Sequence, residues 1–189
     1  PIGAPFWGKA LTFMGIEIQT PLSEILNIPK TGAVVIVSNH PHGLVDGMIL
    51  AELVCRVRSD FRILTRSLLT GIPEIAEFMI PVPFPHEDNS RRLGLEMRNE
   101  TMQHLKNGGV IILFPAGKVA ASEGLTGVFK LVMLKLFISK LALAFTIPFM
   151  IISLPAPGTI VTSLTFASIC AVFPSNVTTS PSTWTCFVD

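Results

Sequence analysis

Hydrophobic positions along the chain alternate between short continuous runs and longer stretches with helical spacing. Residues 33–37 and 110–114 are continuous apolar runs bounded by turn residues, which is typical of strands buried on both faces. Apolar residues recur at helical spacing over 44–57, and a helix is expected over 91–106, with Asn89 and Ser90 placed to cap its start and Asn107-Gly108-Gly109 placed to end it. Strands that alternate with helices predict an α/β single domain with a largely parallel central sheet flanked by helices.

Three further segments have the composition of strands. Residues 61–64 form a short apolar run, whereas 79–84 is interrupted by prolines and is expected to be an edge strand or a strand end. After Lys140 no charged residue occurs until Asp189, but prolines cut this stretch into pieces shorter than the ~20 residues that cross a bilayer. We therefore expect a core strand around 149–154, with a re-entrant or membrane-lying segment as the alternative.

The pattern divides the chain into three parts. Residues 1–30 form an N-terminal helical segment, in which 5–15 predicts a short helix that either contacts a membrane or packs on the domain's own core. Residues 31–173 hold the α/β domain. Residues 174–189 are rich in Ser, Thr and Pro and have no assigned role.

Composition narrows the function classes. Hydrophobic residues make up 49% and charged residues 14% of the chain, against the roughly 25% charged content of an ordinary soluble domain. The formal net charge of +1 provides no basic field for a nucleic acid partner. The three cysteines form no C-x-x-C pair, which indicates a reducing compartment rather than a zinc knuckle or a disulfide framework. We expect a protein associated peripherally with a membrane surface, at its cytoplasmic face.

Two histidines and an acid follow the buried strand at 33–37, where the chain enters the helix at 44–57. A histidine that acts as a general base needs a carboxylate to fix its tautomer and to stabilise the imidazolium, and Asp46 is the acid nearby. His40 lies closer to the strand end, whereas His42 stands four residues before Asp46, so that one helical turn would bring these two together. The alternative is that the histidine has a structural role, with its hydrogen bonds made within the loop that follows the strand.

A second run follows the strand at 110–114. Phe114, Pro115, Ala116 and Gly117 form a turn that exposes backbone N–H groups beside the cation of Lys118. A turn of this kind can hold an oxyanion or a phosphate. By itself the pattern is also ordinary turn chemistry after a strand.

Together the two runs resemble the glycerolipid acyltransferase family, whose members include lysophosphatidate acyltransferases. That family has an N-H-x(4)-D motif after its first core strand and an F-P-E-G-T-R motif after a later one, and the separation of His40 from Pro115 is similar to the family's. Here five residues rather than four separate His40 from Asp46, Ala116 replaces the Glu, and Val119 stands where an Arg is usual. These departures resemble the haemolysin-like branch, with its N-H-P-x-G-x-x-D-G and F-P-A-G-x-V patterns.

The resemblance implies a 1-acylglycerol-3-phosphate O-acyltransferase-like activity in phospholipid biosynthesis. A fatty acyl group would pass from acyl-CoA or acyl-carrier protein, with no further cofactor, to a hydroxyl of a lysophospholipid-like acceptor of the glycerol phosphate type. His40 would be the general base and Asp46 would orient it. The 114–117 loop would stabilise the oxyanion, and the acceptor's phosphate would bind Arg91, Arg92 and Lys118.

Two alternatives belong to other classes. A metal-dependent hydrolase is suggested by His40, His42 and Asp46, a set similar to the H-x-H-x-D-H motif, but it needs further ligands downstream, where only His86 and His104 remain. A catalytically inactive lipid-binding homologue would keep the fold without the reaction. The sequence has no G-x-S-x-G elbow, Walker loop or G-x-G-x-x-G motif.

Overall fold

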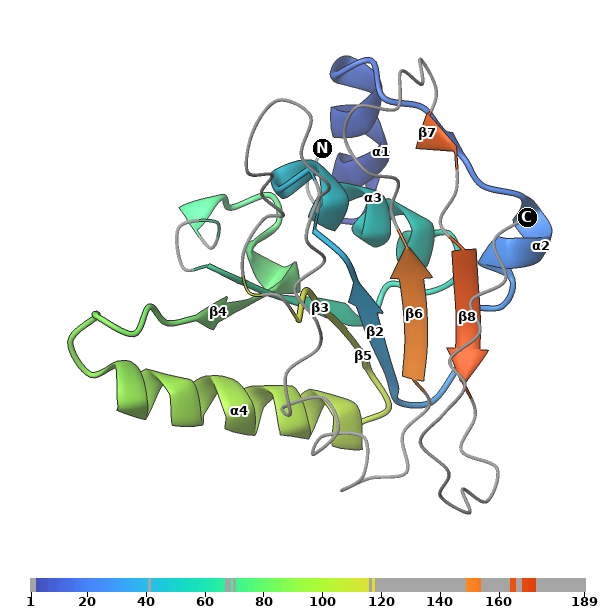
Figure 1. Cartoon of the computed structure of the whole chain (residues 1–189). Helices are drawn as coiled ribbons and strands as arrows, with labels where there is room; N and C mark the ends of the chain where they lie inside the picture. The colour runs from blue at the N-terminus through green and yellow to red at the C-terminus, as the bar shows by residue number, and fades with distance from the viewer. Residues whose placement is uncertain are drawn as a thin grey trace, which may run out of the picture.

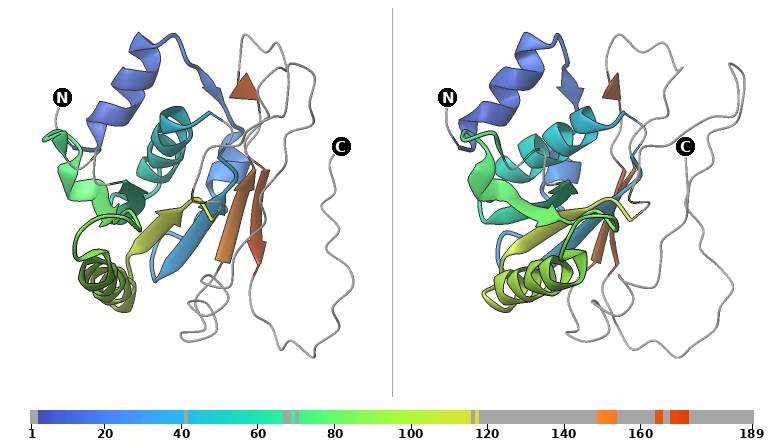
Figure 2. Two further views of the ribbon diagram at one scale, coloured as in Figure 1. Left: turned by 60° about the vertical axis from the view of Figure 1, so that its left-hand side comes forward. Right: turned by 90° about the vertical axis from the view of Figure 1, so that its left-hand side faces the viewer.

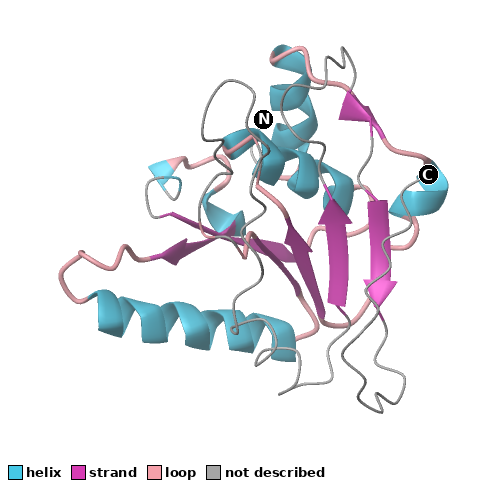
Figure 3. Ribbon diagram, viewed as in Figure 1, coloured by secondary structure: helices cyan, strands magenta, loops and turns pink. Residues whose placement is uncertain are grey.

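The computed structural model describes residues 3–40, 42–66, 69, 71–115, 117, 149–153, 164–165 and 168–172. Its main sheet is built from β2 (Val34–Ser38), β3 (Phe61–Arg66), β4 (Met79–Val82), β5 (Val110–Leu113), β6 (Phe149–Ser153) and β8 (Ser168–Val172). The strand order is β4-β3-β5-β2-β6-β8, and every neighbouring pair is parallel except β6 with β8 (Figures 1 and 3). The predicted α/β domain with a largely parallel sheet is confirmed. A separate two-stranded pairing joins β1 (Ile18–Gln19) to β7 (Leu164–Thr165).

Helices cover both faces of this sheet. They are α1 (Pro5–Phe13), α2 (Leu22–Ile25), α3 (Leu44–Cys55) and α4 (Ser90–Lys106), with a 3-10 turn, η2, at Ala76–Phe78. Alternate residues of β2 separate the two layers, because Val34 and Ile36 pack in one apolar cluster with α1 and α3, whereas Val35 and Val37 pack in a second cluster with α4. Figure 2 shows α1 and α3 on one side of the sheet and α4 on the other.

The strand predictions agree with the structure. All five residues of β2 and all four of β5 are buried, as expected of parallel strands covered on both faces. The proline-containing strand β4 lies at the edge, where Pro81 costs no central ladder bond. The segment expected as a core strand at 149–154 is β6, which pairs with β2. Within the described ranges, the structure has no helix that is both long enough and apolar enough to cross a bilayer.

The N-terminal helix α1 packs on the domain through one face. Trp7 and Leu11 are buried and belong to the same apolar cluster as α3 and the sheet. The far end of the helix is different, since Phe13 is 93% exposed and Met14 is also exposed. The segment expected at 5–15 therefore has both a core-facing side and an apolar exposed end. The unassigned tail from residue 174 lies outside the described residues.

The ends of α4 give one correction. The expected capping of its start by Asn89 and Ser90 is wrong: Asn89 occupies the N-cap position in the left-handed region (φ 64°) and makes no side-chain cap bond, while Ser90 Oγ donates to Pro85 O (3.4 Å). A side-chain cap needs an extended N-cap residue, which Asn89 is not. The expected end is confirmed, because Gly108 has φ 85° and its N–H donates to Leu105 O (2.9 Å).

Arg58 ties together the loops that precede β2, β3 and β5. Its guanidinium pairs in bidentate fashion with Asp60, with both N–O distances at 2.6 Å. It also donates to the carbonyl oxygens of Pro29 (3.0 Å), Gly32 (2.8 Å) and Gly108 (2.7 Å). The buried Arg58 guanidinium thereby holds together the amino ends of these three strands. The candidate site lies at the opposite, carboxyl ends of the strands.

Candidate active site

The loop between β2 and α3 brings two histidines to one carboxylate. Asp46, in the first turn of α3, is fully buried. Its Oδ2 lies 3.0 Å from His40 Nδ1 and accepts the His42 backbone N–H (2.9 Å), while its Oδ1 lies 3.0 Å from His42 Nδ1. Gly43, with φ 68°, makes the turn that lets the chain enter α3 after the histidines. The structure therefore brings together the acid and both candidate bases.

The shared carboxylate assigns the tautomers of the two rings. A carboxylate only accepts hydrogen bonds, so each imidazole donates to Asp46 from Nδ1–H. A neutral imidazole that carries its proton on Nδ1 has its lone pair on Nε2. The proton-accepting atom of each histidine is therefore the nitrogen that points away from Asp46.

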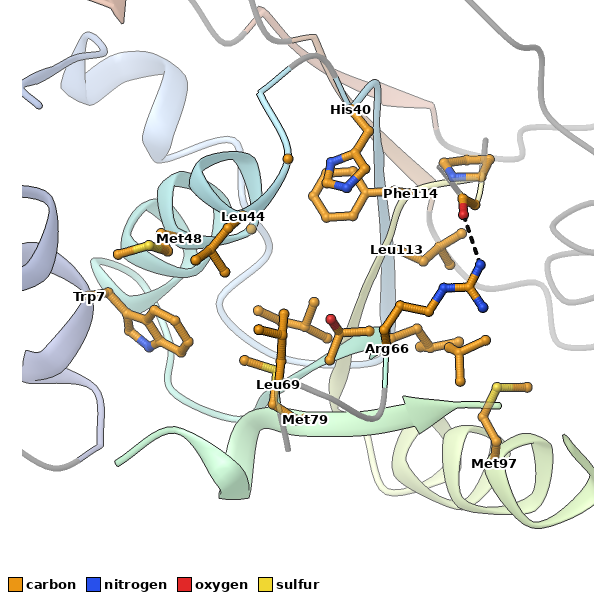
Figure 4. Close-up of a pocket in the computed structure, with 18 residues that line it drawn as sticks. Trp7, His40, Leu44, Met48, Arg66, Leu69, Met79, Met97, Leu113 and Phe114 are labelled. Atoms are coloured by element: carbon orange, nitrogen blue, oxygen red, sulfur yellow. Dashed lines mark hydrogen bonds between the residues drawn. The ribbon is translucent and has the colours of Figure 1, made fainter. Parts of the chain in front are cut away.

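A cavity of about 410 Å³ lies at the carboxyl ends of the parallel strands (Figure 4). It is lined by Trp7, His40, Gly43, Leu44, Gly47, Met48, Ile63, Leu64, Thr65, Arg66, Leu69, Met79, Val82, Met97, Leu113, Phe114, Pro115 and Gly117. His40 is part of this wall, whereas His42 and Asp46 are not among the described lining residues. His40 and His42 thus share a carboxylate, but only His40 faces a volume in which a substrate could bind.

The second sequence motif meets the first in this cavity. Phe114, directly after β5, stacks on the His40 ring with the centroids 4.1 Å apart and the planes 24° apart. Pro115 and Gly117 also line the cavity. The Gly117 N–H donates to Phe114 O (3.0 Å), so this N–H closes the turn. Ala116 lies outside the described residues, and so does Lys118.

Arg66 is a cation at the cavity that the sequence reasoning missed. It is the last residue of β3, lines the cavity, and donates from Nη2 to Gly117 O (3.2 Å). Its guanidinium carbon lies 4.3 Å from the Phe84 ring centroid. The sequence could have shown its position, because residues at the carboxyl ends of parallel strands are the ones expected near a ligand. The strand was predicted to end at Leu64, so Arg66 was not recognised as such a residue.

The structure places Arg91 and Arg92 in the first turn of α4, where both are exposed. Arg92 pairs with Glu96 one turn further along the helix, with both side chains more than half exposed. Neither arginine is among the described residues of the cavity wall. Their assignment to the acceptor's phosphate stays a prediction.

The metal-hydrolase alternative finds no support in this geometry. His40 and His42 both direct Nδ1 to the same carboxylate instead of converging with it on a common point. Of the parts of the chain that can be described, none brings three or more His, Cys, Asp or Glu residues into a metal-binding group. His104 lies in α4, where its Nε2 is 3.1 Å from Asp60 O.

Comparison with known proteins shows the family of the chain. A family model described as Acyltransferase matches residues 22–154, which include the His40 loop, Asp46 and the loop after β5. No curated protein and no solved structure matches the chain.

Proposed function

The chain belongs to the acyltransferase family, and we propose that it transfers a fatty acyl group from acyl-CoA or acyl-carrier protein to a hydroxyl of a lysophospholipid-like acceptor. One observation carries this proposal: His40 is hydrogen-bonded to buried Asp46 and lines a largely apolar cavity that also holds Arg66. A base, an apolar wall and a cation are what a fatty acyl chain and an anionic hydroxyl acceptor require.

In the proposed reaction His40 Nε2 takes the proton of the acceptor hydroxyl as its oxygen attacks the thioester carbonyl carbon. The tetrahedral intermediate then collapses, the carbon–sulfur bond breaks, and the leaving thiolate receives the proton from the imidazolium. Asp46 keeps the ring in the Nδ1–H tautomer and stabilises its charged form. Phe114, stacked on His40, adds a favourable ring face to that cation.

We propose Arg66 as the group in the cavity that binds the acceptor's phosphate. An arginine has five N–H donors in a fixed fork, and the bond to Gly117 O occupies one of them. The Phe84 ring beneath the guanidinium limits its rotamers, so little further ordering is needed to bind an anion. Arg91 and Arg92 would then act at the outer part of the head group. A glycerol phosphate-type acceptor would place the protein in phospholipid biosynthesis, and the motifs around His40 and Pro115 would place it in the haemolysin-like branch.

Membrane association at the cytoplasmic face is the location that we propose. Large apolar side chains are exposed on the first two helices and after them, namely Phe13, Met14, Leu22 and Leu26. Exposed apolar groups of this size favour contact with a lipid surface. Flotation with liposomes tests the membrane contact: Phe13→Asp together with Leu22→Asp should reduce the bound fraction, and unchanged flotation would contradict membrane binding through these residues.

The reaction itself is tested by thiol release from palmitoyl-CoA with and without lysophosphatidate, followed by mass spectrometry of the lipid product. We expect release that depends on the acceptor and a product with one added acyl chain. Glycerol 3-phosphate and lysophosphatidylcholine serve as matched acceptors that lack, respectively, the acyl chain and the free phosphate. Thiol release without acceptor would mean thioester hydrolysis, and lipid binding without release would favour the inactive lipid-binding homologue.

A further inference from the structure

The cavity has two chemically different ends (Figure 4). At one end, next to α1 and α3, the wall is made of large apolar side chains, namely Trp7, Leu44, Met48, Leu69 and Met79. Toward the other end, next to α4, lie Arg66 and Met97, while His40 and Phe114 stand between the two ends. A substrate with one apolar and one charged part can therefore bind in only one direction without burying its charge against an apolar wall.

Trp7 forms the extreme of the apolar end. Its side chain is 1% exposed and lies at the edge of the lining set in Figure 4. Its ring contacts those of Phe6, Phe61 and Phe78, with centroids 5.5, 6.4 and 5.8 Å away, and none of the three is among the described lining residues. Trp7 is therefore part of a packed aromatic cluster.

The helix that carries Trp7 lies outside the matched family region, which begins at residue 22. Part of the cavity wall is thus supplied by a segment that lies outside the matched region. Two bonds anchor the segment: the Gly3 N–H donates to Glu74 O (2.9 Å), and the Phe6 N–H donates to Gly3 O (2.9 Å). The position of Trp7 is set by this local structure and by the packing of α1 on α3.

We propose that Trp7 closes the apolar end of the cavity and limits the length of the acyl chain that the donor can present. The inference rests on the proposed function, because it places the thioester carbonyl at His40 and directs the chain away from Arg66. The terminal methyl group of the longest well-accepted chain then meets the indole ring. A longer chain would have to displace Trp7 from its aromatic cluster, at the cost of the packing contacts of that ring.

A purely structural role for Trp7, as the anchor of α1, makes a different prediction. Removing an anchor lowers stability and lowers the rate with all donors by the same factor, whereas removing a wall changes the rank order of chain lengths. The Trp7 indole N–H has no hydrogen-bond partner in the described structure. Trp7→Phe therefore removes an unpaired buried donor together with part of the ring, which makes it a mild variant for stability.

The experiment measures kcat/KM of Trp7→Phe and Trp7→Ala with a series of saturated acyl-CoA donors from C10 to C20. Burial of one CH₂ group is worth about 0.8 kcal/mol, or roughly fourfold in binding. For a donor two carbons longer than the wild-type optimum, kcat/KM relative to that optimum should rise on the order of tenfold in Trp7→Ala and less in Trp7→Phe. Phe6→Leu, on the same helix and in the same cluster but outside the described cavity wall, should leave the rank order unchanged. An unchanged rank order in both Trp7 variants would overturn the inference.

A binding measurement separates this inference from the proposed function. The chain has two tryptophans, so Trp184→Phe leaves Trp7 as the single fluorophore. Titration with palmitate should change the Trp7 emission, whereas butyrate at the same concentration should not, because its short chain buries far less apolar surface and binds much more weakly. If the emission responds to palmitate but no acceptor supports acyl transfer, the acyl-chain site next to Trp7 is supported and the proposed reaction is contradicted. If acyl transfer occurs but the emission does not respond, the proposed reaction is supported and the role of Trp7 at the end of the acyl chain is contradicted.

Discussion

The two ends of the parallel sheet carry the same residue types and use them differently. At the amino end, Arg58 pairs with Asp60 and donates to three backbone carbonyls, and His104 Nε2 donates to Asp60 O. At the carboxyl end, His40 donates to the Asp46 carboxylate and lines a cavity that also holds Arg66. The partner of the histidine differs: a neutral carbonyl at one end and a carboxylate at the other.

Electrostatics follow from these partners. Burial, helped by the nearby Arg62 and opposed by the backbone of Asp60, holds the pKa of His104 below its usual value, so this ring is kept neutral. The bond from Arg58 keeps the pKa of Asp60 below its usual value. His40 has a different partner, because its Nδ1 lies 3.0 Å from the carboxylate of buried Asp46. A His and an Asp near each other thus indicate chemistry only when the carboxylate faces the ring and the ring faces a cavity.

The largest effect should come from the histidine at the carboxyl end. His40→Ala should lower acyl transfer by at least the ~10²-fold typical of a lost general base. His42→Ala should cost far less, because His42 does not line the cavity, although it helps to hold Asp46. Addition of a chelator should cost nothing. Single-turnover rates of the folded variants are the measurement.

The same series contains outcomes that contradict the assignment. An equal loss in both variants, together with sensitivity to the chelator, would restore the metal-hydrolase alternative. A loss in His42→Ala alone would keep the reaction and move the base. His104→Gln, at the amino end, is the matched control and should leave the single-turnover rate unchanged.

The amino end should respond in stability and not in rate. Arg58→Met removes a 6%-exposed cation and leaves three backbone carbonyls without their donor, which should cost about 3 kcal/mol in the free energy of unfolding. Urea unfolding measures the loss, and kcat of the remaining folded protein should stay near the wild-type value. A large fall in kcat with unchanged stability would mean that the two ends do not differ as described.

Two sets of cations are proposed to bind the acceptor's phosphate, namely Arg66 in the cavity and the pair Arg91 and Arg92 on α4. Arg66→Met should raise the KM for lysophosphatidate by roughly tenfold or more while changing the KM for acyl-CoA little, because a charge-assisted bond to phosphate is worth about 1.5–3 kcal/mol. Arg91→Ala with Arg92→Ala should have the smaller effect, since both side chains are exposed outside the described cavity wall. The reverse ranking would return the phosphate site to α4.

Most of the sheet could be predicted from the sequence because continuous β-branched runs such as 34–37 and 110–113 have few alternatives to buried strands. The pairing of His40 with Asp46 was also predictable, since it depends on residues six positions apart. Two features were not. The stacking of Phe114 on His40 and the wall formed by Trp7 arise from contacts between segments distant in the chain, which hydrophobic periodicity does not encode. Arg66 was missed for another reason, because the strand that carries it was predicted to end at Leu64.

The smallest expected effect is the pH dependence of the amino end. The folded pKa of His104 is lowered from 6.5, so in the window below 6.5 the unfolded chain binds more protons than the folded one. This histidine's contribution to stability is therefore fully present above pH 6.5 and is lost as the pH falls through the lower folded pKa. His104→Gln keeps an N–H donor that does not titrate, and both proteins retain His40, His42 and Asp60. Urea unfolding at about pH 7.5 and about pH 5 should show that the wild type loses more stability than the variant on acidification. Equal losses would mean that the ring is not held neutral by burial, and the contrast between the two histidine environments would then rest on the cavity alone.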